Sequence, residues 1–153
     1  MIARTHQDLE GVRRTVTRLR KLSDRLIKIG PLGVGLDGAL SFFPLAGVIY
    51  SVGAGGLMML QGYRARAPKG VLIRMGALLF VNTLLDVPGG TPLGIFSGLA
   101  DTFFTAHKWA ADLLLKSMDE TLYVEGGPAS PEYAQRLADI RAGREKRHVV
   151  FLG

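Results

Sequence analysis

The hydrophobic residues follow three patterns along the chain. From Thr5 to Ile29 they recur every three or four positions, which predicts an amphipathic helix that begins at a capping box of Thr5 and Asp8 and ends at Gly30 and Pro31. From Gly38 to Tyr63 the chain contains no Lys, Arg, Asp, Glu or His. After Tyr123 the sequence becomes polar, and a short helix is predicted from Pro131 to about Arg147, with Ser130 as its cap.

The uncharged run predicts a segment buried in a membrane. About 20 apolar residues in a helix cross the roughly 30 Å hydrocarbon core of a bilayer. A second apolar helix is predicted from Val71 to Leu85, and a third from Leu93 to about Ser117. We therefore expect an all-α integral membrane protein with about two to three membrane-embedded helices. An amphipathic basic N-terminal helix and a short C-terminal helix flank them.

This pattern divides the chain into three parts. Residues 1–30 form the basic helix, residues 31–122 the membrane-embedded domain, and residues 123–153 a polar linker, short helix and peripheral tail. The stretches PLAGVIYS, from Pro44, and PLGIFS, from Pro92, are alike. They predict an internal repeat of residues 37–63 and 71–117.

Each half of the repeat contains residues that interrupt a helix. Proline removes a backbone hydrogen bond and clashes with the preceding turn. The result is either a kinked crossing helix or a re-entrant hairpin, and both topologies remain open. Small residues near the breaks allow helices to approach closely in lipid. The predicted breaks are Pro44, Gly47, Pro88, Pro92 and Gly94, and the predicted packing positions are Gly47, Ser51, Gly55, Gly94 and Gly98.

A few polar residues lie within or beside the apolar stretches. An ionisable group at membrane depth is costly, so it is a candidate functional residue. Asp37 and Asp86 adjoin breaks and could instead cap helices. Asp101 is the better candidate for a buried polar contact. The candidate polar site is Asp37, Asp86, Asp101, Arg74 and Asn82.

The charge distribution indicates the partner. A net charge of +6 suits nucleic acid or anionic lipid, but the mean hydropathy of +0.23 favours lipid. We expect a bilayer with anionic headgroups as partner, no nucleic acid, and a location in the bacterial inner membrane with cytoplasmic termini. The residues expected at the headgroups are Arg13, Arg14, Arg18, Arg20, Lys21, Arg25 and Lys28. The alternative is that they form the solvated face of a helix packed on its own domain.

Signals of catalysis are absent from the sequence. The chain has no cysteine, which excludes thiolate chemistry and cysteine-bound metals. The glycines Gly33, Gly35 and Gly38 match a dinucleotide fingerprint by letter, but a basic helix precedes them where the motif requires a strand. We expect no enzymatic activity, no cofactor and no metal site.

Three stretches resemble a bacterial membrane-associated family called domain of unknown function 4112. They are GLDGALSFFPLAG (35–47), PKGVLIRM (68–75) and LLDVPGGTPLG with the following LADTFFTAHKWAADLL, up to Leu114. Val48 and Ile95 stand where the family tends to carry an acidic residue. The resemblance implies a membrane location and no established activity.

Two functions fit this sequence. The first is a small non-catalytic membrane protein that self-associates or binds a membrane partner through its small-residue faces. The alternative is an oligomeric channel or transporter-like pathway for an ion or small solute that uses the intramembrane aspartates.

Overall fold

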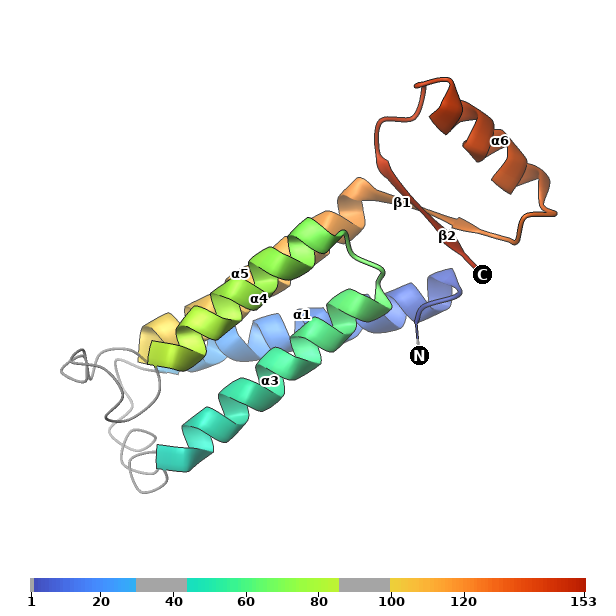
Figure 1. The fold of residues 1–153 in the computed structure, drawn as a ribbon. Coiled ribbons are helices and arrows are strands. Elements are labelled where there is room, and N and C mark those ends of the chain that lie inside the picture. Colours follow the sequence, from blue (N-terminus) through green and yellow to red (C-terminus); the bar gives the residue numbers. More distant parts are fainter. Residues whose placement is uncertain (1, 30–43, 86–99) are drawn as a thin grey trace.

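The helices of this computed structural model form an elongated bundle. Residues 2–29, 44–85 and 100–153 are described. Helices α3 and α4 form one side of the bundle, and α1 and α5 form the other (Figure 1). The bundle helices are α1 (His6–Ile29), α3 (Pro44–Arg64), α4 (Lys69–Leu85) and α5 (Ala100–Glu120).

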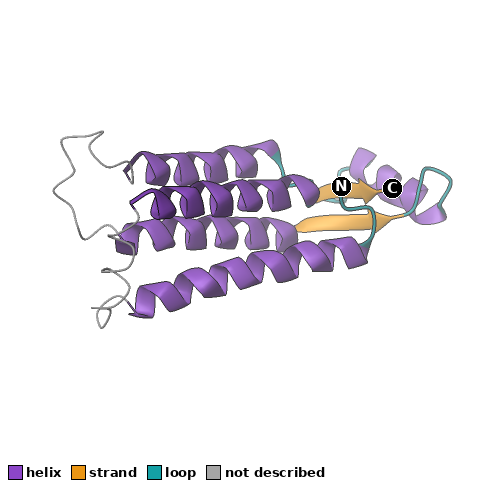
Figure 2. Cartoon of the chain, turned by 90° about the horizontal axis from the view of Figure 1, so that it is seen from below, coloured by secondary structure: helices purple, strands orange, loops and turns teal. Residues whose placement is uncertain are grey.

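A small sheet closes one end of the bundle. Strand β1 (Thr121–Glu125) follows α5 directly and pairs in parallel with β2 (His148–Leu152), in the register Thr121 to His148. Parallel strands need a crossover, which here contains α6 (Pro131–Arg141). Figure 2 shows the strands beyond one end of the bundle helices, with both chain termini nearby.

Local sequence signals place several helix ends. Asp8 accepts the backbone N–H of Thr5 at 3.2 Å and the Thr5 hydroxyl accepts that of Asp8 at 3.1 Å, so the predicted capping box is confirmed. The Ser130 hydroxyl accepts from the Tyr133 N–H at 3.1 Å, which confirms the predicted cap of α6. Helix α3 begins at Pro44, where a missing N–H costs nothing.

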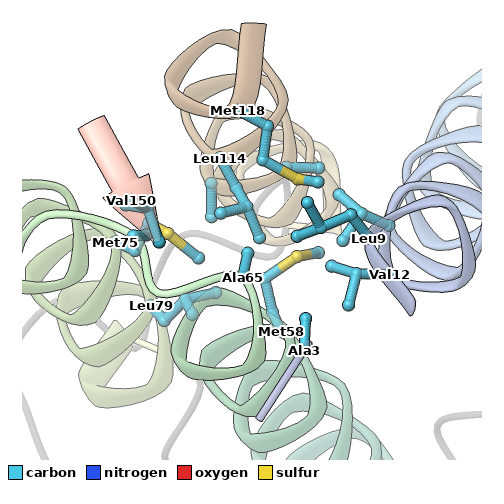
Figure 3. Packing of buried hydrophobic residues seen from close by; sticks show 14 of the residues in the cluster. Ala3, Leu9, Val12, Met58, Ala65, Met75, Leu79, Leu114, Met118 and Val150 are labelled. Atoms are coloured by element: carbon cyan, nitrogen blue, oxygen red, sulfur yellow. The ribbon is translucent and has the colours of Figure 1, made fainter. Parts of the chain in front are cut away.

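The core lies where the four bundle helices and the sheet meet. Figure 3 shows side chains from every bundle helix and from β2 pointing into this cluster. Its α1 members, Leu9, Val12 and Val16, belong to the predicted apolar stripe. The other elements contribute Met58 from α3, Met75 and Leu79 from α4, Ala110, Ala111, Leu114 and Met118 from α5, and Val150 and Leu152 from β2.

The prediction of an integral membrane fold was wrong. Within residues 2–29, 44–85 and 100–153, no helix combines the length and the apolar character that crossing a bilayer requires. The physical reason lies partly in the core, because α3 and α4 bury Met58, Met75 and Leu79 against the other helices. Apolar residues that the sequence assigned to lipid thus fill the interior of a helix bundle.

The prediction of an all-α fold was also incomplete. The described part of the chain is mostly helical but contains the parallel pair β1 and β2. Helix α6 ends at Arg141 rather than near Arg147, and the segment HVVFL becomes a strand. Val150 and Leu152 of that strand are buried in the core, so the tail is not peripheral. A run of four apolar residues is too short for periodicity to identify a strand.

Candidate interaction surface

The predicted polar site falls largely outside the described structure. Asp37 and Asp86 lie beyond the described residues. Asp101 and Asn82 belong to α5 and α4, but their side chains are not described. Arg74 lies exposed on α4. The described residues therefore do not bring this set together, and the site stays a prediction.

The predicted breaks and packing residues divide in the same way. Helix α3 begins at Pro44 and continues through Gly47 and Ser51, whose side-chain surroundings are not described. Gly55 is buried inside the bundle, where an added Cβ would lie 3.9 Å from both Leu79 Cβ and His107 Nε2. The remaining members, Pro88, Pro92, Gly94 and Gly98, lie outside the described residues.

Two of the basic residues expected at lipid headgroups pair within the chain. Arg13 lies 2.5 Å from the Asp119 carboxylate, and Arg20 lies 2.5 Å from Asp112. Both acidic residues belong to α5, so these ion pairs join α1 to α5. They are half-exposed, so each contributes on the order of 0.2–1 kcal/mol.

The remaining basic residues of α1 follow a different stripe. Arg14, Arg18 and Lys21 are exposed and recur at steps of four and three. Arg25 and Lys28 continue the same spacing in the helix, although their side chains are not described. This stripe points away from the buried residues Leu9, Val12 and Val16. We call α1 and α5, with their ion pairs and basic stripe, the charged side of the bundle.

The opposite side of the bundle carries large apolar side chains in contact with solvent. On α3 the exposed apolar residues are spaced by five, three and three positions, which places them on one side of the helix, facing away from Met58. On α4, Ile73 is 71% exposed and Phe80 is 63% exposed. We call this surface the apolar face. It consists of Val52, Leu57, Leu60 and Tyr63 on α3, and Ile73, Phe80 and Val81 on α4.

The charged residues within the α3–α4 hairpin all have one sign. From Pro44 to Leu85 the chain contains no Asp or Glu, and its charged residues are Arg64, Arg66, Lys69 and Arg74. Arg66 donates to the Phe151 carbonyl at 2.6 Å and is half-buried. Lys69 and Arg74 are exposed on α4, where Lys69 shares a stripe with Ile73 and Arg74 shares the neighbouring stripe with Val81. The apolar face is therefore bordered by basic side chains at its α3–α4 turn.

Sequence reasoning missed the outward direction of these residues. The sequence of α3 between Pro44 and Tyr63 is uncharged on every side of the helix, so its polarity does not separate a buried stripe from an exposed one. The available signal was the absence of acidic residues over 44–85. That signal identifies the segment without saying which side of each helix faces outward.

The described titratable groups with shifted pKa values take part in structural contacts rather than in a metal-binding cluster. In the parts of the chain that the structure describes, no group of three His, Asp or Glu residues is placed to bind a metal ion. The shifted pKa values belong to structural contacts. The Arg4 N–H lowers the pKa of Asp8, and hydrogen bonds from Arg147 lower that of Glu145 to about 2.

Tyr123 is a third group whose pKa is shifted. Burial raises its pKa above the usual value, and its hydroxyl donates to the Ala65 carbonyl at 2.9 Å. This contact joins β1 to the turn between α3 and α4. Its role is to hold the sheet against the bundle.

Comparison with known proteins gives one match. The sequence model of the family described as a domain of unknown function (DUF4112) matches residues 12–118. This range covers α1 from Val12 onward, the helices α3 and α4, and α5 up to Met118. No curated protein and no solved structure shows significant similarity to the chain.

Proposed function

Since the chain belongs to the DUF4112 family, whose description assigns no function, we propose from its surface that it is a non-catalytic interaction module that docks on a lipid bilayer. The docking surface is the apolar face of α3 and α4. The proposed location is the cytoplasmic leaflet of the bacterial inner membrane, because that leaflet is anionic.

One observation carries this proposal: the apolar face has no covering element in the described chain. Monomeric proteins rarely expose contiguous apolar patches beyond a few hundred Å², and larger ones mark protein or membrane contacts. On α3 the stripe from Val52 to Tyr63 contains no charged residue. Burying such side chains contributes about 25 cal/mol per Å² of apolar area removed from water.

The charges favour a bilayer over a second copy as occupant. A symmetric dimer through this face would place the same surface of two copies together. Such a dimer would bury two hairpins of the same positive sign against each other, with no acidic residue between 44 and 85 to compensate. An anionic bilayer instead complements these charges.

Vesicle co-sedimentation tests the proposal. The variant Leu60→Gln/Phe80→Gln changes two exposed side chains, so it should fold like the natural chain. Each of the two substitutions removes roughly 1 kcal/mol or more of favourable transfer free energy. Binding to vesicles of phosphatidylcholine and phosphatidylglycerol should therefore fall about tenfold or more. Ile140→Gln, on α6 and 38% exposed, is the matched control and should bind normally.

Two results would reject the proposal. One is equal vesicle binding by Leu60→Gln/Phe80→Gln and the natural chain. The other is a natural chain that does not bind vesicles but forms a dimer in sedimentation velocity, while Leu60→Gln/Phe80→Gln stays monomeric. That result would assign the apolar face to a second copy. The natural absence of cysteine adds a direct probe. A fluorophore on Val81→Cys should shift to the blue with vesicles, and one on Arg14→Cys should not.

A further inference from the structure

We infer that Lys69 and Arg74, and not the basic stripe of α1, select anionic lipid headgroups when the apolar face meets a bilayer. This inference rests on the proposed function and names the lipid class that it prefers. The sequence offered α1, with its many arginines, as a headgroup-binding element. The arrangement of the helices instead favours Lys69 and Arg74, at the start of α4, as the residues that contact headgroups.

The position of α1 in the bundle keeps its basic stripe away from the apolar face. Helix α1 packs mainly on α5 and forms with it the side of the bundle away from the α3–α4 pair (Figure 1). Arg14, Arg18 and Lys21 point outward from that charged side. A flat surface resting on the apolar face therefore lies across the bundle from these side chains.

The other basic residues of α1 include two that pair with acidic residues of α5. Arg13 and Arg20 are held by Asp119 and Asp112, at 2.5 Å each. An arginine that binds a carboxylate of its own chain has fewer donors and a smaller net field to offer a phosphate. The charged side therefore presents a mixed field, with acidic residues beside its basic ones.

Two basic residues and a tyrosine border the apolar face at the α3–α4 turn. Lys69 and Arg74 are both exposed on α4 beside apolar residues. Lys69 shares a stripe with Ile73, four residues later, and Arg74 shares the neighbouring stripe with Val81, seven residues later. Tyr63 ends the α3 stripe at the same level, because an added Cβ at the adjacent Gly62 would meet Leu72 Cδ2 at 2.8 Å and Met75 Cε at 3.5 Å. Basic and tyrosine side chains bordering an apolar surface match the headgroup layer above acyl chains.

The absence of acidic residues makes this border selective. No Asp or Glu lies between 44 and 85, so nothing in the α3–α4 hairpin neutralises Lys69 and Arg74. A neutral headgroup gains little from these charges. A phosphatidylglycerol headgroup, with its net negative charge, gains an electrostatic contact of the kind that adds to apolar docking.

Two charge-matched variants test the inference. Lys69→Gln/Arg74→Gln and Arg14→Gln/Arg18→Gln each remove two positive charges from the net +6, leaving +4. Binding is measured by co-sedimentation with phosphatidylcholine vesicles, with and without phosphatidylglycerol. The natural chain should bind the anionic vesicles at least tenfold more tightly. Lys69→Gln/Arg74→Gln should lose about tenfold of that preference and keep its binding to neutral vesicles.

The α1 variant is the control and decides the outcome. Arg14→Gln/Arg18→Gln should keep the anionic preference within about twofold. A larger loss in this variant than in Lys69→Gln/Arg74→Gln would overturn the inference, as would equal binding of the natural chain to neutral and anionic vesicles. The proposed function survives both results, since it fails only if Leu60→Gln/Phe80→Gln leaves vesicle binding intact or if the natural chain binds no vesicles.

Discussion

Tyr123 shows how one residue links parts of the chain that are far apart in the sequence. Its hydroxyl donates to the carbonyl of Ala65, and its ring packs on the core. The same burial raises its pKa. Next to it, the Arg66 guanidinium donates to Phe151 of β2, and Arg66 has a φ of 52°. The turn between α3 and α4 thus holds both strands of the sheet.

The shifted pKa of Tyr123 predicts a loss of stability at high pH. An exposed tyrosine ionises near pH 10, and burial makes ionisation harder in the folded chain. Its contribution is therefore fully present below about pH 10 and falls as the pH rises above that value. Tyr123→Phe should cost about 1 kcal/mol at neutral pH and show a shallower alkaline decline in urea unfolding. Identical declines would contradict this, and Tyr63→Phe, with an exposed ring, is the control.

At the scale of the element, glycines of α3 separate its two sides. Gly62 lies against α4, where an added Cβ would be 2.8 Å from Leu72 Cδ2. Gly53 lies on the outward side, and an added Cβ there would meet nothing within 4 Å. Glycine therefore allows close packing on α4 at position 62, whereas at position 53 it only lowers the helix propensity of α3.

This difference predicts unequal effects of one substitution. Gly53→Ala should stabilise the chain by about 0.5–1 kcal/mol, because alanine favours a helix interior over glycine. Gly62→Ala should gain less than this or nothing, because the added methyl group meets Leu72 Cδ2 at 2.8 Å and that side chain must shift. Thermal and urea unfolding measure both. Equal stabilisation by the two variants would mean that α3 does not pack on α4 through Gly62.

For the whole molecule, the C-terminal strand completes the core. Leu152 and Val150 are buried with side chains from the bundle helices, and the amide of Ala3 donates to the Arg64 carbonyl at 3.0 Å near the same end. The polar segment from Glu125 to Arg147 thus connects two strands of one sheet. The molecule has an apolar face, a charged side and a sheet end.

Leu152→Ala tests the role of this strand. Removing a fully buried leucine leaves a cavity, so the free energy of unfolding should fall by about 2–5 kcal/mol. Ile140→Ala, exposed on α6, should change it by less than about 0.5 kcal/mol. A Leu152→Ala chain as stable as the natural one would show that the tail is dispensable, as the sequence pattern alone indicated.

The sequence predicted some of the fold for identifiable reasons. The capping box of Thr5 and Asp8, the cap at Ser130 and the buried stripe of Leu9, Val12 and Val16 were all correct. The membrane-spanning fold was wrong, because α3 and α4 bury part of their apolar surface against other helices. The predicted aspartate site is not tested by the described residues. The apolar face was missed, since uncharged helices carry no polar side that marks the surface.

The sequence by itself therefore determined what depends on neighbours within about four residues: helix starts and ends, caps, and the single-sided stripe of α1. Tertiary structure alone decided which side of α3 and α4 faces outward, that Arg13 and Arg20 pair with α5, and that His148–Leu152 pairs with Thr121–Glu125. The physical reason is range. Capping and periodicity act along one helix, whereas burial and charge pairing depend on elements that only folding brings together.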